Sequence, residues 1–416
     1  MIRPGDVVVN IERVCVELEQ LAQFSDSPAP SVTRILFTQP DLEARIFVCE
    51  RMSQAGLQVH TDAAGNIFGR WDAGDPLLPP VATGSHIDAI PHAGRFDGTV
   101  GVLGGLEALR TLRESGFQPK RPLELIVFNS EEPTRYGIGC LGSRLLSGQL
   151  DTLRASQLVD TNQVTFEETR RMAGCHGSLA DVVLSPGQYH AFVELHIEQG
   201  PKLEEASIPI GVVTAIAAPA AVRVVFHGKG GHAGTVLMPE RVDALLPAAQ
   251  LALVVEQLAL HEGGHDTVAT TGLLQVHPGA INSIPSRVTM EIDVRDIELD
   301  RRNRVLDRIQ QQAQEIGNDR NLKTTVELIN ADPPATCNPT VVAAVKDTCR
   351  TIDVTCLEMI SRAYHDALFM ALIAPTTMVF IPCRDGISHR PEEFATPEAI
   401  KTGIHVLAGT LKRLAE

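Results

Sequence analysis

Residues 123–132 have the sequence LELIVFNSEE, which gives the clearest indication of the fold class. Its first six residues are almost all apolar, and it ends at two adjacent carboxylates, Glu131 and Glu132, just before Pro133. Such a run is typical of a strand buried on both faces, in a mostly parallel sheet covered by helices. In open α/β sheets, ligands bind beyond the carboxyl ends of the strands. The stretch therefore predicts an α/β domain with a site beside this acidic pair, although a helix-capping role for the pair remains an alternative.

Three further apolar runs have the same design, because each leads into a histidine. Residues 80–84 precede His86, residues 191–195 end at His196, and residues 377–381 lie shortly before His389. Apolar residues at helical spacing predict helices over 11–24, 38–55 and 99–112. We therefore expect a mixed, mostly parallel sheet covered by helices.

The middle of the chain has a different pattern of elements. Strands are expected over 222–227, 267–276, 287–294 and 323–329, with helices over 239–261 and 300–316. The order β-α-β-β-α-β is that of a ferredoxin-like α+β module. We expect this module to be an inserted satellite domain over residues 213–331, within a main domain formed by residues 1–212 and 332–416. The proline pair at 333–334 suits the return between them.

Composition excludes several classes of function. The 416 residues carry 36 basic and 51 acidic side chains, a net charge of −15, which opposes binding to nucleic acid. No run of 18 apolar residues or secretory h-region is visible, so no membrane association is expected. The eight cysteines are scattered without a CxxC pair, which is typical of reduced thiols. A cytoplasmic protein is the prediction.

Five polar side chains in the loops after these strands form a candidate metal site: His86, Asp97, Glu132, His196 and His389. Each has an ordinary alternative, such as an N-cap for Asp97 or a solvated turn for His86. Three imidazoles and two carboxylates suit zinc or manganese. Five ligands exceed the needs of one tetrahedral catalytic ion but suit two ions that share a carboxylate. Glu131 would then be free to move a proton, and Asp88 would orient His86.

The polar motifs also resemble those of a known family. They are TGSHIDAIPHAGRFDGTVG, NSEEPTRYGIGCLGSR, ELHIEQGP, GGHAGTVLMPERVDA, HPGAINSIPSRV, EIDVRD and SHRPEE. Together they resemble the M20 family of dinuclear metallo-amidohydrolases, within the group that acts on allantoate, N-carbamoyl-L-amino acids and ureidoglycolate. The resemblance implies a metallopeptidase-like catalytic domain with two divalent ions, manganese in the first place and zinc as an alternative.

The resemblance also implies a role for each ligand. His86 and His196 would bind one ion, Glu132 and His389 the other, and Asp97 would bridge them. Glu131 would be the general base, supported by Asp88 behind His86.

Further residues are implied as substrate contacts, and the satellite domain is implied as the homodimer interface. His232 could stabilise an oxyanion, Arg295 could bind a substrate carboxylate, and Asn282 and Gln199 could donate hydrogen bonds. A surface salt bridge for Arg295 and an Asx turn for Asn282 are the ordinary alternatives. Where related enzymes usually have GAGHDA, this chain has RAYHDA at 362–367, so Arg362 and Tyr364 would add bulk beside the candidate contact His365 and favour a small substrate.

The expected function is hydrolysis of the ureido C–N bond of (S)-ureidoglycolate, giving glyoxylate, ammonia and carbon dioxide in purine catabolism. The nearest rival function is that of an N-carbamoyl-L-amino-acid hydrolase or allantoate amidohydrolase with the same residues. Two more distant candidates are a dipeptidase and a non-catalytic, metal-binding dimeric scaffold.

Overall fold

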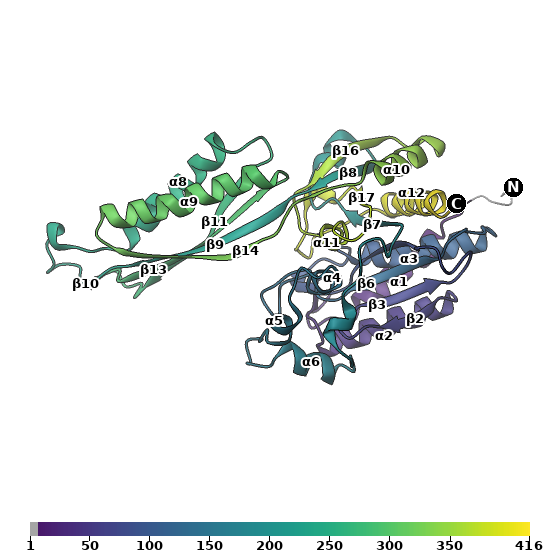
Figure 1. Ribbon diagram of the computed structural model, residues 1–416, viewed down its shortest axis with the longest axis horizontal. Helices are drawn as coiled ribbons and strands as arrows, with labels where there is room; N and C mark the ends of the chain where they lie inside the picture. The colour runs from purple at the N-terminus through teal and green to yellow at the C-terminus, as the bar shows by residue number, and fades with distance from the viewer. Residues whose placement is uncertain (1–6) are drawn as a thin grey trace. The chain divides into compact units, whose positions relative to one another are not determined.

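The computed structural model describes residues 7–416, and it divides into two compact units (Figure 1). The first unit runs to Ala215 and resumes at Thr336, and the second comprises Ile216–Ala335. One chain segment is thus inserted into another domain.

The first unit is built on a nine-stranded mixed sheet. Its strand order is β15-β8-β17-β7-β4-β6-β3-β2, and β16 pairs with β8 outside this path. The four central strands β17, β7, β4 and β6 are mutually parallel. Strand β3 pairs with β6 in the antiparallel direction, and β2 pairs with β3 in the same way. The strands are β2 (Gln58–Thr61), β3 (Ile67–Trp71), β4 (Val81–His86), β6 (Leu123–Phe128), β7 (Ala191–Ile197), β8 (Ile210–Ile216), β15 (Ala335–Thr336), β16 (Cys356–Ser361) and β17 (Thr376–Ile381), besides the separate pair β1 (Val32–Arg34) and β5 (Ala89–Ala93). The predicted mixed α/β fold is confirmed.

Helices of this unit pack on the sheet and on one another. They are α1 (Ile11–Ala22), α2 (Gln39–Gln54), α3 (Thr99–Glu114), α4 (Leu141–Leu146), α5 (Thr152–Ser156), α6 (Phe166–Met172), α7 (Lys202–Ala206), α10 (Pro339–Thr351), α11 (Asp366–Met370) and α12 (Pro397–Ala415), with 3₁₀ turns η1 (Leu179–Val182) and η3 (Arg384–Gly386). Helix α3 contacts β4 and β7 as well as α12. A Cβ at Gly101 would lie 2.4 Å from the Leu195 carbonyl oxygen, so only glycine allows this approach. The close packing brings the start of α3 against the strands that carry His86 and His196.

The second unit is a four-stranded antiparallel sheet in the order β11-β13-β9-β14, with two long helices. Its elements are β9 (Ala218–His227), β10 (Gly231–His232), η2 (Met238–Glu240), α8 (Leu245–His261), β11 (Val268–His277), β12 (Ser283–Ile284), β13 (Arg287–Asp296), α9 (Leu299–Asp319) and β14 (Lys323–Ala331). Alternate strand residues such as Val222, Val224 and Phe226 are buried in one core with helix residues such as Leu251 and Ile309. The order and pairing of its main elements are those of a ferredoxin-like module.

The edges of the second unit differ slightly from the sequence-based expectation of 213 and 331. Strand β8 belongs to the first unit's sheet, since Val212 pairs with Val379 of β17, and the first unit runs on to Ala215. At the return, the buried Arg302 donates to the carbonyl of Asp332, which ties that residue to the second unit. The second unit therefore runs a few residues further along the chain than its strand pattern indicates.

None of the helices found in residues 7–416 combines the length and the hydropathy needed to cross a bilayer.

Candidate metal centre

The five candidate ligands come from four strand ends and one helix start in the first unit. His86 ends β4, His196 lies near the end of β7, Glu132 follows β6, and His389 follows β17. Since these strands are parallel, their carboxyl ends meet at one edge of the sheet. Asp97 stands just before α3, but it is not the helix cap, because the N-cap is Gly98. The structure brings all five side chains together.

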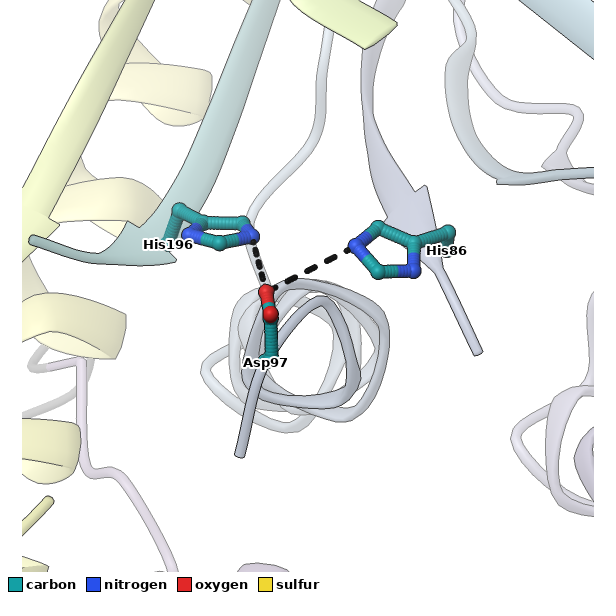
Figure 2. A group of neighbouring side chains, drawn as sticks. All are labelled: His86, Asp97 and His196. Carbon is teal, nitrogen blue, oxygen red and sulfur yellow. Dashed lines mark ion pairs between the residues drawn. The ribbon is translucent and has the colours of Figure 1, made fainter. Parts of the chain in front are cut away.

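Asp97 lies at the centre of this group, and its two carboxylate oxygens face different histidines. Oδ1 lies 3.1 Å from His196 Nε2 and 3.7 Å from His86 Nε2. Figure 2 shows both histidine rings turned toward the carboxylate of Asp97. Oδ2 lies 3.1 Å from His389 Nε2, and that nitrogen is 3.3 Å from Glu132 Oε1. Two groups of three side chains therefore share the carboxylate of Asp97, and each group could hold one cation.

The imidazole hydrogen bonds indicate what belongs between these atoms. Nδ1 of His86 lies 3.0 Å from the Asp88 carbonyl, and Nδ1 of His196 lies 2.9 Å from the Ile197 carbonyl. A carbonyl oxygen only accepts, so both Nδ1 atoms must donate, and in the neutral rings each Nε2 is an acceptor close to Asp97. The Nε2 of His196 also accepts from the backbone nitrogen of Gly98 at 3.2 Å. Two acceptors facing each other repel unless a proton or a cation lies between them. The donor set thus fits a divalent cation with nitrogen and oxygen ligands.

The pKa values of the candidate ligands also indicate that this group of side chains favours additional positive charge. For His389, the hydrogen bond to Asp97 outweighs burial and raises the pKa to about 9, with help from Glu132. Burial raises the pKa of Glu132 to about 7, and the negative charge of Asp97 adds to the rise. Burial alone would raise the pKa of Asp97, but its hydrogen bonds to His196 and His389 hold it well below its usual value. In the metal-free protein, protons thus take the place of cations.

Glu131 lies beside the ligands without belonging to either group of three. Its Oε2 lies 3.8 Å from His86 Nε2, and its Oε1 accepts a hydrogen bond from the Cys140 thiol at 3.4 Å. Burial raises the pKa of Glu131 well above 4.5, and Glu132 adds to this rise against the opposing charge of His86. A buried carboxylate of this kind is suited to accept and return a proton.

The structure places two groups of Asp88 near His86. Its carboxylate Oδ1 lies 3.6 Å from His86 Nδ1, longer than a hydrogen bond, and its main-chain carbonyl lies 3.0 Å from the same nitrogen. The carboxylate accepts from the backbone nitrogens of Glu131 at 3.1 Å and Glu132 at 3.0 Å. Asp88 therefore orients His86 through its backbone and the acidic pair through its side chain.

The remaining candidate residues of the first unit lie around this centre. Gln199 donates through Nε2 to Asp97 Oδ2 at 3.1 Å, and its Oε1 finds no partner among the described residues. The ring of His365 is buried 4.5 Å from that of His196, and its Nε2 likewise finds no hydrogen-bond partner among residues 7–416. Tyr364 accepts a hydrogen bond from Arg144 at 3.1 Å.

Three expected substrate contacts belong to the second unit. His232 lies on the short strand β10 and accepts a hydrogen bond from Gly234 N. Asn282 lies just before β12. Arg295 lies on β13, where it forms an ion pair of 2.9 Å with Asp293.

Two buried acids that support the centre were not predicted from the sequence. Glu393 accepts hydrogen bonds from both loops that carry Asp97 and His389. Glu194 accepts from Ser85 Oγ at 2.7 Å and from Ala367 N at 3.0 Å, and so joins β4 and β7 to the segment after His365. The position of Glu194, two residues before His196 on one face of a strand, was a signal for it.

The chain is similar to known proteins over most of its length. A model of peptidase family M20/M25/M40 matches residues 82–413. A ureidoglycolate hydrolase of Oryza sativa subsp. japonica is 54% identical, covering 96% of this chain and 84% of that protein. An N-carbamoyl-L-amino-acid amidohydrolase of Pseudomonas sp. (strain NS671) is 37% identical, covering 96% and 97%. The crystal structure of AtUAH in complex with (S)-hydroxyglycine is 51% identical over 98% of both chains, with a TM-score of 0.89.

Proposed function

Because this chain belongs to peptidase family M20/M25/M40, we propose that it is a metal-dependent amidohydrolase that hydrolyses (S)-ureidoglycolate. The reaction cleaves the ureido C–N bond and yields glyoxylate, ammonia and carbon dioxide. The observation that carries the proposal is the shared carboxylate of Asp97 with the spare Glu131 beside it. The choice of substrate is supported by identities of 54% and 52% with two plant ureidoglycolate hydrolases, against 37% with carbamoyl-amino-acid amidohydrolases.

The residues of the centre divide the work between binding and proton transfer. His86 and His196 would hold one divalent cation, Glu132 and His389 a second, and Asp97 both. When bound, such a pair polarises a carbonyl and lowers the pKa of water. Glu131 takes the proton of the attacking water and returns it to the leaving nitrogen, a role that its raised pKa and its burial support. We propose manganese as the metal and zinc as the alternative, because a donor set without thiolates accepts both.

The substrate is tested by ammonia release from protein stripped with a chelator and refilled with manganese or zinc. Ureidoglycolate, allantoate, an N-carbamoyl-L-amino acid and a dipeptide are compared at equal concentrations. We expect ureidoglycolate to have the highest kcat/KM by at least about tenfold, since substrates that fill a site differently are separated by about 1–3 kcal/mol. Faster turnover of the N-carbamoyl amino acid would assign the chain to that activity instead.

Glu131→Gln separates an enzyme from a metal-binding scaffold. The variant keeps the size of the side chain and all five ligands, so we expect it to bind metal while kcat falls about 10²–10⁴-fold. A suitable control is Glu205→Gln, an exposed acid on α7. If neither the variant nor the unchanged protein turned over any of the four substrates, the scaffold alternative would stand.

We also propose that the second unit forms a homodimer. Leu246, Leu253 and Leu260 are 47%, 67% and 67% exposed on α8, and their seven-residue spacing aligns them on one face of the helix. Beside them β11 is an edge strand, paired with β13 alone in its sheet. An apolar stripe next to a free strand edge favours association with a second copy.

Light scattering after gel filtration tests the dimer. Leu253→Lys places a charge in the centre of the stripe and should give a monomer, whereas the exposed Leu153→Lys in the first unit should not. An unchanged dimer in Leu253→Lys would place the interface elsewhere. The roles of His232, Asn282, Arg295, Tyr364 and His365 toward the substrate, and the cytoplasmic location, stay predictions from the sequence.

A further inference from the structure

One buried carboxylate, that of Glu393, joins the two loops that carry Asp97 and His389. Its Oε1 accepts from the backbone nitrogens of Phe96 at 2.9 Å and Asp97 at 3.0 Å. Its Oε2 accepts from Ser388 Oγ at 2.9 Å and from the backbone nitrogen of His389 at 3.3 Å. Each carboxylate oxygen thus accepts from one of the two loops, which lie almost 300 residues apart in the sequence.

We propose that Glu393 is a positioning residue that sets the distance between Asp97 and His389 and thereby builds the cation site that contains Glu132. The inference rests on the proposed metal site. Glu393 itself stays outside both groups of three candidate ligands, so its effect on a cation is transmitted through the backbones of the two ligands.

The conformation of His389 explains why this loop needs such a support. Its φ of +60° lies in the left-handed region, which is unfavourable for a residue with a Cβ. Its side chain is also 46% exposed, so packing restrains it less than His86 or His196, which are almost fully buried. The hydrogen bond from His389 N to Glu393 fixes the backbone where packing does not.

The loop before Asp97 is shaped to receive Glu393. A Cβ at Gly94 would lie 2.4 Å from both Cβ and Oε1 of Glu393, so the absence of a side chain there makes room for the carboxylate. The two loops also pack against each other through Phe96 and Phe394, whose rings meet edge to face with their centroids 5.6 Å apart. The arrangement is therefore built into both loops.

The two cation sites should depend on Glu393 to different degrees. The site of His389, Glu132 and Asp97 takes two ligands from loops that Glu393 holds, whereas the site of His86, His196 and Asp97 takes one. Loss of the carboxylate should therefore weaken one binding step more than the other. A residue needed only for general stability would affect both steps alike.

The test is a calorimetric titration of metal-stripped protein with Mn²⁺, followed by electron paramagnetic resonance of the loaded protein. We expect Glu393→Gln to weaken one of the two binding steps by about 10–100-fold, the usual effect of losing a partner behind a ligand, and to abolish the signal of a coupled manganese pair. The neighbouring Glu392→Gln makes the same change of charge on an exposed side chain and should bind both ions as before. The melting temperature of each metal-free variant is measured alongside.

Gly94→Ala supplies a second perturbation that keeps the charge of Glu393 and displaces its side chain. The backbone of Gly94 lies outside the left-handed region, so alanine is acceptable there apart from the clash. We expect the same selective loss at one site, even if Glu393→Gln fails to fold. Unchanged affinities in either folded variant, or an equal loss at both sites with a lower melting temperature, overturn the inference. An unmodified protein that binds fewer than two ions overturns the proposed function as well.

Discussion

Replacing Asp88 with asparagine separates two explanations of how the acidic pair and His86 are held. The buried carboxylate of Asp88 accepts from the backbones of Glu131 and Glu132, while its carbonyl accepts from His86. Asparagine keeps the carbonyl and one acceptor oxygen, but it turns an NH₂ group toward one of the two backbone N–H groups. One buried donor is then unsatisfied, which costs about 1–3 kcal/mol.

Hydrogen exchange measures this cost where it arises. A local opening that is easier by about 1–3 kcal/mol exchanges about 5- to 150-fold faster, so the amides of Glu131 and Glu132 should lose protection by that factor in Asp88→Asn. The ¹⁵N shifts of His86 should still report a proton on Nδ1, because the carbonyl of residue 88 is unchanged. We expect kcat to fall about 10–100-fold as the pair shifts.

Asp41→Asn is the matched control. Asp41 is equally buried and accepts from the backbone nitrogen of Phe37 at 2.7 Å, far along the chain from the acidic pair. Its substitution should speed exchange at Phe37 and leave Glu131 and Glu132 as they are. The reasoning would be refuted if Asp88→Asn changed the tautomer of His86 while the two glutamate amides kept their protection.

The charges and the packing of the first unit lead to further predictions. In metal-free protein the raised pKa values of Glu132, about 7, and His389, about 9, mean that the folded state binds these protons more tightly than the unfolded chain. Their contribution to stability is therefore lost as pH rises, between about 4.5 and 7 for Glu132 and between about 6.5 and 9 for His389. Differential scanning fluorimetry should show a melting temperature that falls over this pH range, and the fall should be smaller in His389→Gln. Manganese must displace the same protons, so calorimetry should find that its affinity rises with pH and levels off above about 9; a pH-independent affinity would contradict the shared site. Removal of metal by a chelator should lower the unfolding free energy by about 2.7 kcal/mol relative to protein in metal at about 100 times Kd, as a thermal melt will measure. Gly101→Ala should destabilise the fold by about 1–3 kcal/mol in urea unfolding, because the new methyl group meets the Leu195 carbonyl; a stability equal to that of Gly272→Ala, where nothing lies within 4 Å and φ is not positive, would refute the packing argument.

Local sequence patterns predicted most of the elements and the residue types of the candidate site. Apolar runs such as 123–128 predicted the central strands, and the rule that ligands bind at strand ends singled out residues such as Glu132 and His196. Apolar periodicity also predicted the elements of the second unit. These features depend on neighbours within a few residues, so a local pattern records them.

The contacts among these side chains depend on the folded structure. Asp97 turns one oxygen to His196 and the other to His389, and the carboxylate of Asp88 accepts from the backbone of the acidic pair. Glu393 contacts residues almost 300 positions earlier in the chain, and its own sequence surroundings suggest an exposed acidic turn. Hydrogen bonds of this kind form wherever the fold brings a buried donor to an acceptor. Their partners are set by the packing of distant segments, which leaves no periodic trace in the sequence.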